Sequence, residues 1–306
     1  MRVKYVNLDG VENQKTLSDM RRWQRERKSK KKDMSVHIPY AERNRLDEVL
    51  HNKTGSSLTW IGHSTFLIQM QGVTILTDPV WANRMGLQQR LTRPGIPLQD
   101  MPEIDIVVIS HGHYDHLDFP TLRNLRGKPL YLVPAGLKRL FERKGFHNVQ
   151  ELHWWEHTEH RGIEFHFVPA QHWTRRSLFD MNTSHWGGWI LKSHTETVYF
   201  VGDTGYFRGF QLIAEKFQID TVLMPIGAYE PEWFMKVSHI NPEDAVKAFL
   251  ELGAKRFVPM HYGAYRLADD TGPEALDRLH KEWQRLQLPA EKLMVLSIGE
   301  TRFQES

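Results

Sequence analysis

The chain has 306 residues, of which 40% are hydrophobic and 25% are charged, and its formal net charge is +3. This length and composition suit one large folded core. The chain contains no cysteine, which excludes a disulfide framework and leaves histidine and carboxylate side chains as metal ligands. The amino terminus is polar, and no stretch approaches the roughly 18 apolar residues of a membrane span, so we expect a cytoplasmic protein.

Residues 1–57 are expected to form a polar, basic extension ahead of one folded domain at 58–306. Within the extension, the segment from Arg21 to Lys32 carries eight basic residues and one acidic residue, a charge of +7, whereas the rest of the chain sums to −4. We interpret this segment first as a solvated arm lying across an acidic face of the body. A peripheral contact with the inner membrane surface, with Trp23 as interfacial anchor, is the second interpretation. Nucleic acid is not expected as a partner.

Apolar runs and turn residues predict a series of strands and helices along the domain. Strands are expected near 58–70, 73–78, 104–110, 129–134, 149–155, 163–169, 187–192, 197–202, 221–226, 256–261 and 293–298. Helices are expected near 117–126, 135–145, 209–217, 241–252 and 272–287. Strands precede helices in both halves of the chain, which favours an α/β protein with two sheets packed face to face and helices outside.

The most informative motif directly follows the strand predicted at 104–110. It runs from His111 to His116 and reads His-Gly-His-Tyr-Asp-His. A strand ending at Ser110 places His111 and His113 on the same side of the chain, and the following turn lets Asp115 and His116 face the same point. Imidazole and carboxylate are natural ligands of zinc, with manganese or iron as alternatives. The motif therefore predicts a metal site and can offer ligands to two ions, but a site with two ions needs more ligands than this loop supplies.

Three more candidate ligands follow predicted strands elsewhere in the chain. His172 follows the strand at 163–169, Asp203 the strand at 197–202, and His261 closes the strand at 256–261. Each lies where an apolar run gives way to a loop with glycine or proline, the position from which α/β sheets present functional side chains. Their recurrence at strand ends makes them candidates for the same metal site.

These motifs, in this order, resemble the metallo-β-lactamase superfamily. The resemblance is closest to the N-acylphosphatidylethanolamine-hydrolysing phospholipase D family and its bacterial relatives, and it covers roughly residues 58–303. The segments that carry it are 59–65, 76–79, 110–118, 171–173, 202–206, 225–231, and 233–236 with His239. The resemblance implies a four-layer αββα sandwich that holds two zinc ions. It assigns one ion to His111, His113 and His172, the other to Asp115, His116 and His261, and makes Asp203 the bridge between them.

The same resemblance implies a phosphodiesterase of the phospholipase D type, acting on phosphodiesters such as N-acylphosphatidylethanolamine. A hydroxide bridging the two ions would attack phosphorus, oriented by Asp115. His239 is expected to act as a general acid or as a donor to the phosphate, although it could instead only precede a helix that begins near Asn241. A metal-dependent lactonase for sugar-phosphate or acyl-homoserine lactones is the alternative function, followed by a non-enzymatic binding module and a nuclease. A homodimer is the first alternative to a monomer.

Overall fold

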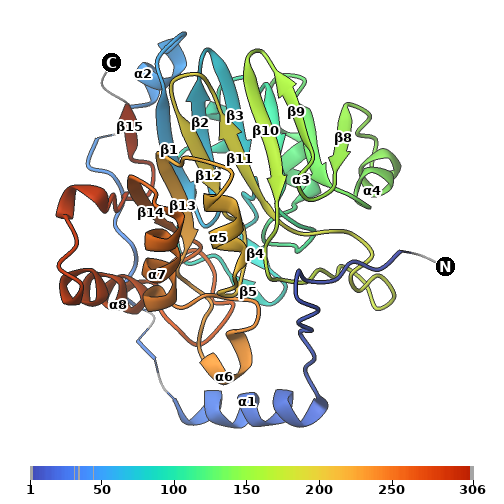
Figure 1. The fold of residues 1–306 in the computed structure, drawn as a ribbon, viewed down its shortest axis with the longest axis vertical. Coiled ribbons are helices and arrows are strands. Elements are labelled where there is room, and N and C mark those ends of the chain that lie inside the picture. The colour runs from blue at the N-terminus through green and yellow to red at the C-terminus, as the bar shows by residue number, and fades with distance from the viewer. Residues whose placement is uncertain (1–2, 31, 34, 44, 304–306) are drawn as a thin grey trace.

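The computed structural model describes residues 3–30, 32–33, 35–43 and 45–303. Parts of the predicted extension (1–2, 31, 34 and 44, including Lys31 of the basic segment) and the last three residues of the predicted domain (304–306) lie outside the described residues. Two β-sheets packed face to face form the centre of the structure, and helices cover their outer faces (Figure 1).

The first sheet has the strand order β15-β1-β2-β3-β6-β7-β8. Strands β15, β1, β2 and β3 pair antiparallel, whereas β3, β6, β7 and β8 pair parallel. At the centre of the sheet, Val107 pairs with Leu76 on one side and Tyr131 on the other. The strand bounds are β1 Ser57–Gly62, β2 Thr65–Met70, β3 Val73–Thr77, β6 Ile106–Val108, β7 Leu130–Pro134, β8 Val149–Leu152 and β15 Thr301–Phe303.

The second sheet has the order β14-β13-β12-β11-β10-β9. Strands β9 to β12 pair antiparallel, and β12, β13 and β14 pair parallel. The bounds are β9 His157–His160, β10 Ile163–Val168, β11 Gly188–Lys192, β12 Thr197–Phe200, β13 Thr221–Pro225 and β14 Arg256–Met260. A separate small hairpin joins β4 Arg84–Met85 to β5 Gln88–Gln89.

Alternation along the strands separates two apolar cores. Ile106 and Val108 of β6 point between the sheets, where they join Phe167 and Trp189 of the second sheet. Val107, between them, points to the other face and packs with the helices there. Helices α2 Leu46–His51, α3 Phe119–Arg123 and α4 Lys138–Arg143 cover the first sheet, and α5 Gly209–Ala214, α7 Pro242–Leu252 and α8 Gly272–Arg285 cover the second (Figure 1). The predicted four-layer αββα sandwich of the α/β class is confirmed.

Two predicted strands are wrong in detail. The run at 58–70 is a hairpin, because the chain turns between β1 and β2 at His63, whose φ is +55°. The run at 293–298 is no strand: Leu293 and Ile298 make only isolated bridges to Phe257 and Tyr40, and the strand that closes the sheet is β15. The prediction also missed short or polar elements, namely β4, β5, β9, α1 Leu17–Ser29, α2, α6 Glu232–Met235 and the 3₁₀ turns Leu98–Asp100 and Ala290–Lys292.

Residues 21–29 of the basic segment belong to helix α1, which lies against α6 at one end of the molecule (Figure 1). Thr16 caps the helix in a capping box with Asp19. The Trp23 ring packs on Phe234 and its indole N–H donates to Asp269 at 2.7 Å. Trp23 therefore packs on the body of the protein, and its role as an interfacial anchor stays a prediction.

Basic residues after Trp23 pair with acidic side chains of the body. Arg27 lies 3.1 Å from Asp269, and Lys32 lies 2.9 Å from Glu230 and 2.7 Å from Glu274. This is the arrangement of an arm lying across an acidic face. No helix in the described ranges is long and apolar enough to span a bilayer.

Candidate metal centre

The candidate ligands follow strands that run in one direction within each sheet. In the first sheet β1, β3 and β6 are codirectional, because β2 is antiparallel to both β1 and β3, and β6 is parallel to β3. The same reasoning makes β10, β12 and β14 codirectional in the second sheet. Side chains that follow such strands meet at the carboxyl edge of each sheet. They are His63, Asp78 and His111 in the first sheet and His172, Asp203 and His261 in the second.

The loop after β6 places its four candidate ligands by a tight turn. Beyond the strand, the Ile109 N–H still donates to Leu132 O, which continues the ladder almost to His111. The N–H groups of His116 and Leu117 then both donate to His113 O, at 3.2 and 2.9 Å. This turn brings the residues from 113 to 116 back over the end of the strand.

One group of imidazoles forms around His113. The Nδ1 of His113 lies 2.9 Å from His111 Nε2 and 3.2 Å from His172 Nε2. Ligand atoms of these three histidines all lie within 4.8 Å of one another. His111 and His172 are buried, and the Trp173 ring packs edge-on against His113 at 4.6 Å between centroids.

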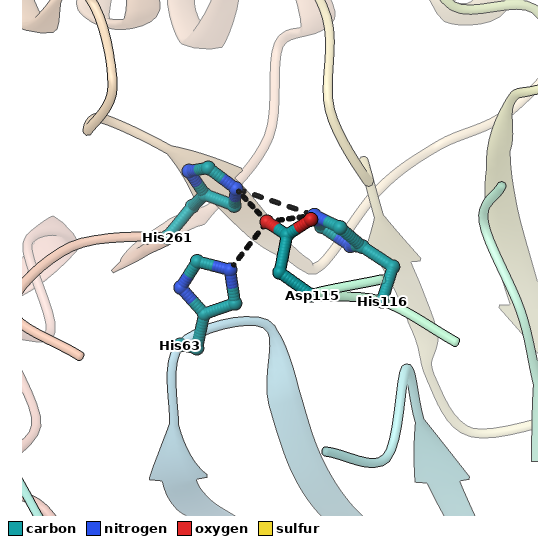
Figure 2. A group of neighbouring side chains, drawn as sticks. All are labelled: His63, Asp115, His116 and His261. Carbon is teal, nitrogen blue, oxygen red and sulfur yellow. Dashed lines mark hydrogen bonds and ion pairs between the residues drawn. The ribbon is translucent and has the colours of Figure 1, made fainter. Parts of the chain in front are cut away.

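A second group lies beside the first and is drawn in Figure 2. His116 Nε2 and His261 Nε2 are 3.2 Å apart, and both face the carboxylate of Asp115, at 3.3 and 3.5 Å. His63 completes this group, with its Nε2 3.0 Å from Asp115 Oδ2. Ligand atoms of all four residues lie within 4.8 Å of one another.

Asp203 lies between the two groups. Its Oδ1 is 3.0 Å from His261 Nε2, and its Oδ2 is 3.3 Å from His116 Nε2 and 3.8 Å from His172 Nε2. The side chain is almost completely buried. Oδ1 thus faces the second group, and Oδ2 lies between His116 of the second group and His172 of the first, so the carboxylate is within reach of both groups.

Hydrogen bonds fix which ring nitrogens are free to coordinate. His172 Nδ1 donates to Ser238 O at 2.8 Å, and His116 Nδ1 donates to Asp78 Oδ2 at 2.6 Å. The Ser110 hydroxyl donates to Asp78, so its oxygen accepts from His111 Nδ1. In the neutral form, each of these three rings therefore carries its proton on Nδ1 and directs the Nε2 lone pair into the cluster.

The sequence analysis did not assign His63 and Asp78 to the site, although both lie in segments that carry the family resemblance. Asp78 is fully buried and accepts hydrogen bonds from the Ser110 N–H and hydroxyl as well as from His116. His63 follows β1 across the turn that the prediction overlooked. Both residues satisfy the criterion that selected Asp203, a polar side chain directly after an apolar run, so the signal was present in the sequence.

His239 reaches the site from the segment before α7. Asn241 caps that helix by accepting the Asp244 N–H at 2.8 Å, so His239 does precede a helix N-terminus. Its ring nevertheless faces the cluster: Nδ1 lies 3.8 Å from Asp203 Oδ2, and His172, Asp203 and His239 form a third group of convergent ligand atoms. Its side chain is 17% exposed, and Asp115 beside it is 13% exposed, so both can be reached by a substrate.

Burial and neighbouring carboxylates shift the pKa values of the buried histidines in opposite directions. Burial alone would lower the pKa of His261, but Asp203 and Asp115 raise it to about 9, and with Asp78 they raise the pKa of His116 well above its usual value. Burial lowers the pKa of His113 to about 4. The carboxylates thus favour positive charge at His116 and His261, as they would favour a metal cation.

The donor set fits metal ions. Zinc with nitrogen ligands at about 2.0–2.1 Å in a tetrahedron has ligand atoms about 3.3 Å apart. The contacts of His113 with His111 and His172, and of His116 with His261, lie between 2.9 and 3.2 Å. Histidine and aspartate without cysteine also suit manganese and iron. The residues therefore form two adjacent sets of ligand atoms at coordination spacing.

Comparisons with known proteins give the family. Residues 73–262 match the model described as the beta-lactamase superfamily domain. The chain is 38% identical over 234 residues to N-acyl-phosphatidylethanolamine-hydrolyzing phospholipase D 1 of Caenorhabditis elegans, which covers 70% of this chain and 66% of the relative. It is 29% identical over 214 residues to a UPF0173 metal-dependent hydrolase of Pyrobaculum neutrophilum, covering 69% of this chain and 85% of that protein.

The fold is also similar to solved structures. The structure of Igni18, a metallo hydrolase from Ignicoccus hospitalis, aligns with a TM-score of 0.64 and 24% identity, covering 83% of this chain and 100% of that one. The matched region spans just under two thirds of the length of the worm phospholipase, so the activity of that whole enzyme is not carried over with the family. The family match, the fold and the sequence identity to these relatives together show that the chain belongs to the metallo-β-lactamase superfamily of metal-dependent hydrolases.

Proposed function

We propose that this protein is a phosphodiesterase of the phospholipase D type that works with two zinc ions. The observation that carries the proposal is the pair of adjacent ligand groups joined by Asp203. One ion would be held by His111, His113 and His172, and the other by Asp115, His116 and His261, with Asp203 shared. When bound, the two ions supply Lewis acidity toward the phosphoryl oxygens and lower the pKa of water toward neutrality.

The protein groups then have three tasks. Asp115, held at 3.0 Å by His63, orients the attacking water as well as serving as a ligand. His239 carries one N–H as a neutral imidazole and donates it to a phosphoryl or leaving-group oxygen. The buried carboxylate of Asp78 fixes the His116 ring, and with it the second ligand group.

A cationic surface hollow supports a phospholipid as substrate; it shares Tyr114 and Asp118 with the loop that carries candidate ligands, although the ligands themselves do not line it. The hollow has a volume of about 1440 Å³ and includes Tyr114, which lies between two candidate ligands, and Thr174. Basic side chains dominate its lining: Arg123, Lys138, Arg139, Arg143, Lys144, Arg175 and Arg176, against Asp118, Glu142, Glu151 and Asp180. Phe179, 86% exposed, lies on the same wall beside the exposed Leu178. Cationic and apolar groups together suit a phosphate that carries acyl chains.

The test combines metal analysis with hydrolysis assays. Two zinc ions per chain are expected, with chelator-sensitive cleavage of bis-p-nitrophenyl phosphate and N-acylphosphatidylethanolamine that returns when zinc is restored. His113→Ala and Asp203→Asn should each lose metal and activity, whereas His147→Ala, at an exposed histidine away from the cluster, should keep both. Turnover confined to a lactone panel would support the alternative lactonase, and a protein without bound metal would refute both functions.

We propose in addition that the outer face of α1 contacts the inner membrane surface from the cytoplasmic side. Arg21, Arg25 and Lys28 are exposed at helical spacing, line one shallow surface hollow and pair with no acidic side chain among the described residues. Each basic residue near an anionic bilayer contributes about 1 kcal/mol. Replacing all three with glutamine should abolish sedimentation with phosphatidylglycerol-containing vesicles, unlike the same replacement at exposed lysines elsewhere, Lys255, Lys281 and Lys292. Self-association into a homodimer stays a prediction, which light scattering would check.

A further inference from the structure

The amino-terminal residues 3–16, here called the strap, run from the site of His172 to the start of α1. Near its beginning, the Tyr5 N–H donates to Asn182 O at 2.9 Å, and its ring stacks on His185 with centroids 4.5 Å apart. Asn7 follows and is only 6% exposed, which is unusual for asparagine in an otherwise polar, exposed segment. The strap is thus anchored to the domain at the point where Asn7 enters it.

The Asn7 amide makes every hydrogen bond that it can make. Its Nδ2 donates to Val11 O at 2.7 Å and to His172 O at 3.0 Å. Its Oδ1 accepts from the His172 N–H at 3.0 Å and from the Trp186 indole at 2.9 Å. Two donors and two acceptor positions are all that an asparagine side chain offers. Because both partners of Oδ1 can only donate, the orientation of the amide is fixed.

Hydrogen bonds consequently hold both the backbone and the ring of His172. Asn7 takes both backbone polar groups of His172, and Ser238 O takes the ring Nδ1. With backbone and ring both held, the Nε2 of His172 has one direction left, toward His113 and Asp203. Strand pairing does not provide these backbone hydrogen bonds, because His172 lies in a loop between β10 and β11 and belongs to no strand ladder.

The strap also reaches the segment that carries His239. Asn13 Nδ2 donates to Ser238 Oγ at 3.4 Å, and the Lys15 ammonium donates to Phe234 O. The Lys15 ammonium also lies 4.5 Å above the Phe234 ring. The strap therefore connects the two loops, with His172 and His239, that approach Asp203 from the second sheet.

We propose that Asn7 is a positioning residue of the metal centre, acting through His172, and that the strap is a structural part of that centre. The inference rests on the proposed metal site. A residue that only anchored the terminus would stabilise the protein equally with and without metal. A positioning residue instead sets how tightly the ion at His111, His113 and His172 is held, because outer-shell partners of metal-binding histidines orient the ring.

The experiment uses the full chain with two variants at one position. Asn7→Ala removes all four hydrogen bonds, and Asn7→Asp keeps the size and both acceptor roles but cannot donate to His172 O. Asp9→Ala is the matched control, since Asp9 lies on the same strap and, among the described residues, pairs only with Arg208 at the exposed surface. Zinc affinity is measured by competition with a chromophoric chelator, and thermal unfolding is followed for metal-free and zinc-loaded forms.

Both Asn7 variants should bind one of the two zinc ions about 10- to 100-fold more weakly. Zinc should also raise their melting temperature less than that of the wild type, while Asp9→Ala should match the wild type. Equal losses of melting temperature with and without zinc, at unchanged zinc affinity, would assign Asn7 a purely structural role and overturn the inference. If Asn7→Ala fails to fold, the result for Asn7→Asp decides between the two roles. A zinc affinity equal to that of the wild type in Asn7→Asp would then overturn the inference. A wild type without bound zinc would instead refute the proposed function.

Discussion

Asp78 Oδ2 lies 2.6 Å from His116 Nδ1, and both side chains are completely buried. The carboxylate also accepts the Ser110 N–H and hydroxyl, and the same hydroxyl accepts from His111. One carboxylate thus sets the orientation of a histidine in each of the two ligand groups.

This relationship makes Asp78 the outer-shell residue with the widest expected effect. In Asp78→Asn only one of the two heteroatoms can accept, so either the Ser110 N–H loses its acceptor, or the Ser110 hydroxyl and the His116 ring lose theirs. We expect metal affinity and kcat to fall about 10- to 100-fold. Metal content after dialysis and steady-state kinetics measure the effect. Asp277→Asn, in an exposed pair with Lys281, is the control and should change neither.

His63 should affect turnover more than substrate binding. Its Nε2 holds Asp115 at 3.0 Å, and it contacts the proposed second ion's ligands from the side of β1. His63→Ala frees one oxygen of Asp115 and leaves a gap beside His261. We expect kcat to fall about 10- to 100-fold with a smaller change in KM. A KM that rises while kcat stays at the wild-type value would show that His63 serves substrate binding instead.

The metal-free protein should be most stable near its histidine midpoint, about pH 6.5. Burial lowers the pKa of His63 to about 3 and of His239 to about 4, so below pH 6.5 the unfolded chain takes up protons that the folded chain refuses. Asp270, whose pKa burial raises to about 6, offsets part of this loss. The raised pKa of His261, about 9, stabilises the fold below about pH 6.5, and this contribution disappears as the pH rises through 9.

Each proton difference changes stability by up to about 1.4 kcal/mol per pH unit. Urea unfolding of chelator-treated protein between about pH 5 and 9 should therefore show a maximum with losses on both sides. Zinc loading should flatten the alkaline side, because the ion replaces the protons held near His261. A stability that rises steadily to pH 9 without metal would contradict the pKa directions of the cluster.

The contact of α1 with α6 should contribute measurably to stability. Trp23→Ala removes the packing on Phe234 and the hydrogen bond to Asp269. Since Trp23 is only partly buried, we expect a loss of about 1–3 kcal/mol in the free energy of unfolding. Leu17→Ala, at a 78% exposed position on the same helix, should leave stability unchanged. Urea denaturation curves of the two variants compare them directly.

The sequence was sufficient to place the candidate ligands because their positions depend on strand direction. Asp203 and His261 follow strongly apolar runs, and codirectional strands deliver such residues to one edge. The prediction missed His63 as a site residue because apolar residues lie on both sides of the turn after Gly62, so the apolar run looked continuous. The strand predicted at 293–298 was wrong because Leu293 and Ile298 are apolar in order to pack in the core, and they belong to no strand ladder.

Contacts of the extension could not be predicted from any local pattern. Asn7 is one polar residue in a polar segment, and nothing near it indicates that His172 and Trp186 are its partners. Likewise, the charge of the basic segment was visible, but which of its residues meet Glu230 and Asp269 follows only from the tertiary structure. Periodicity reports secondary structure and burial; it carries no information on partners distant in the chain.

The grip of Asn7 on His172 spans 165 residues of sequence, and its bond to Trp186 spans 179. During synthesis Asn7 precedes His172 by 165 residues and Trp186 by 179 residues, so its partners appear only much later. Closing so long a loop is among the slow, late steps of folding. The ion bound beside His172 would accordingly be captured at the end of folding, and a nascent chain would hold little zinc there before its second sheet is complete.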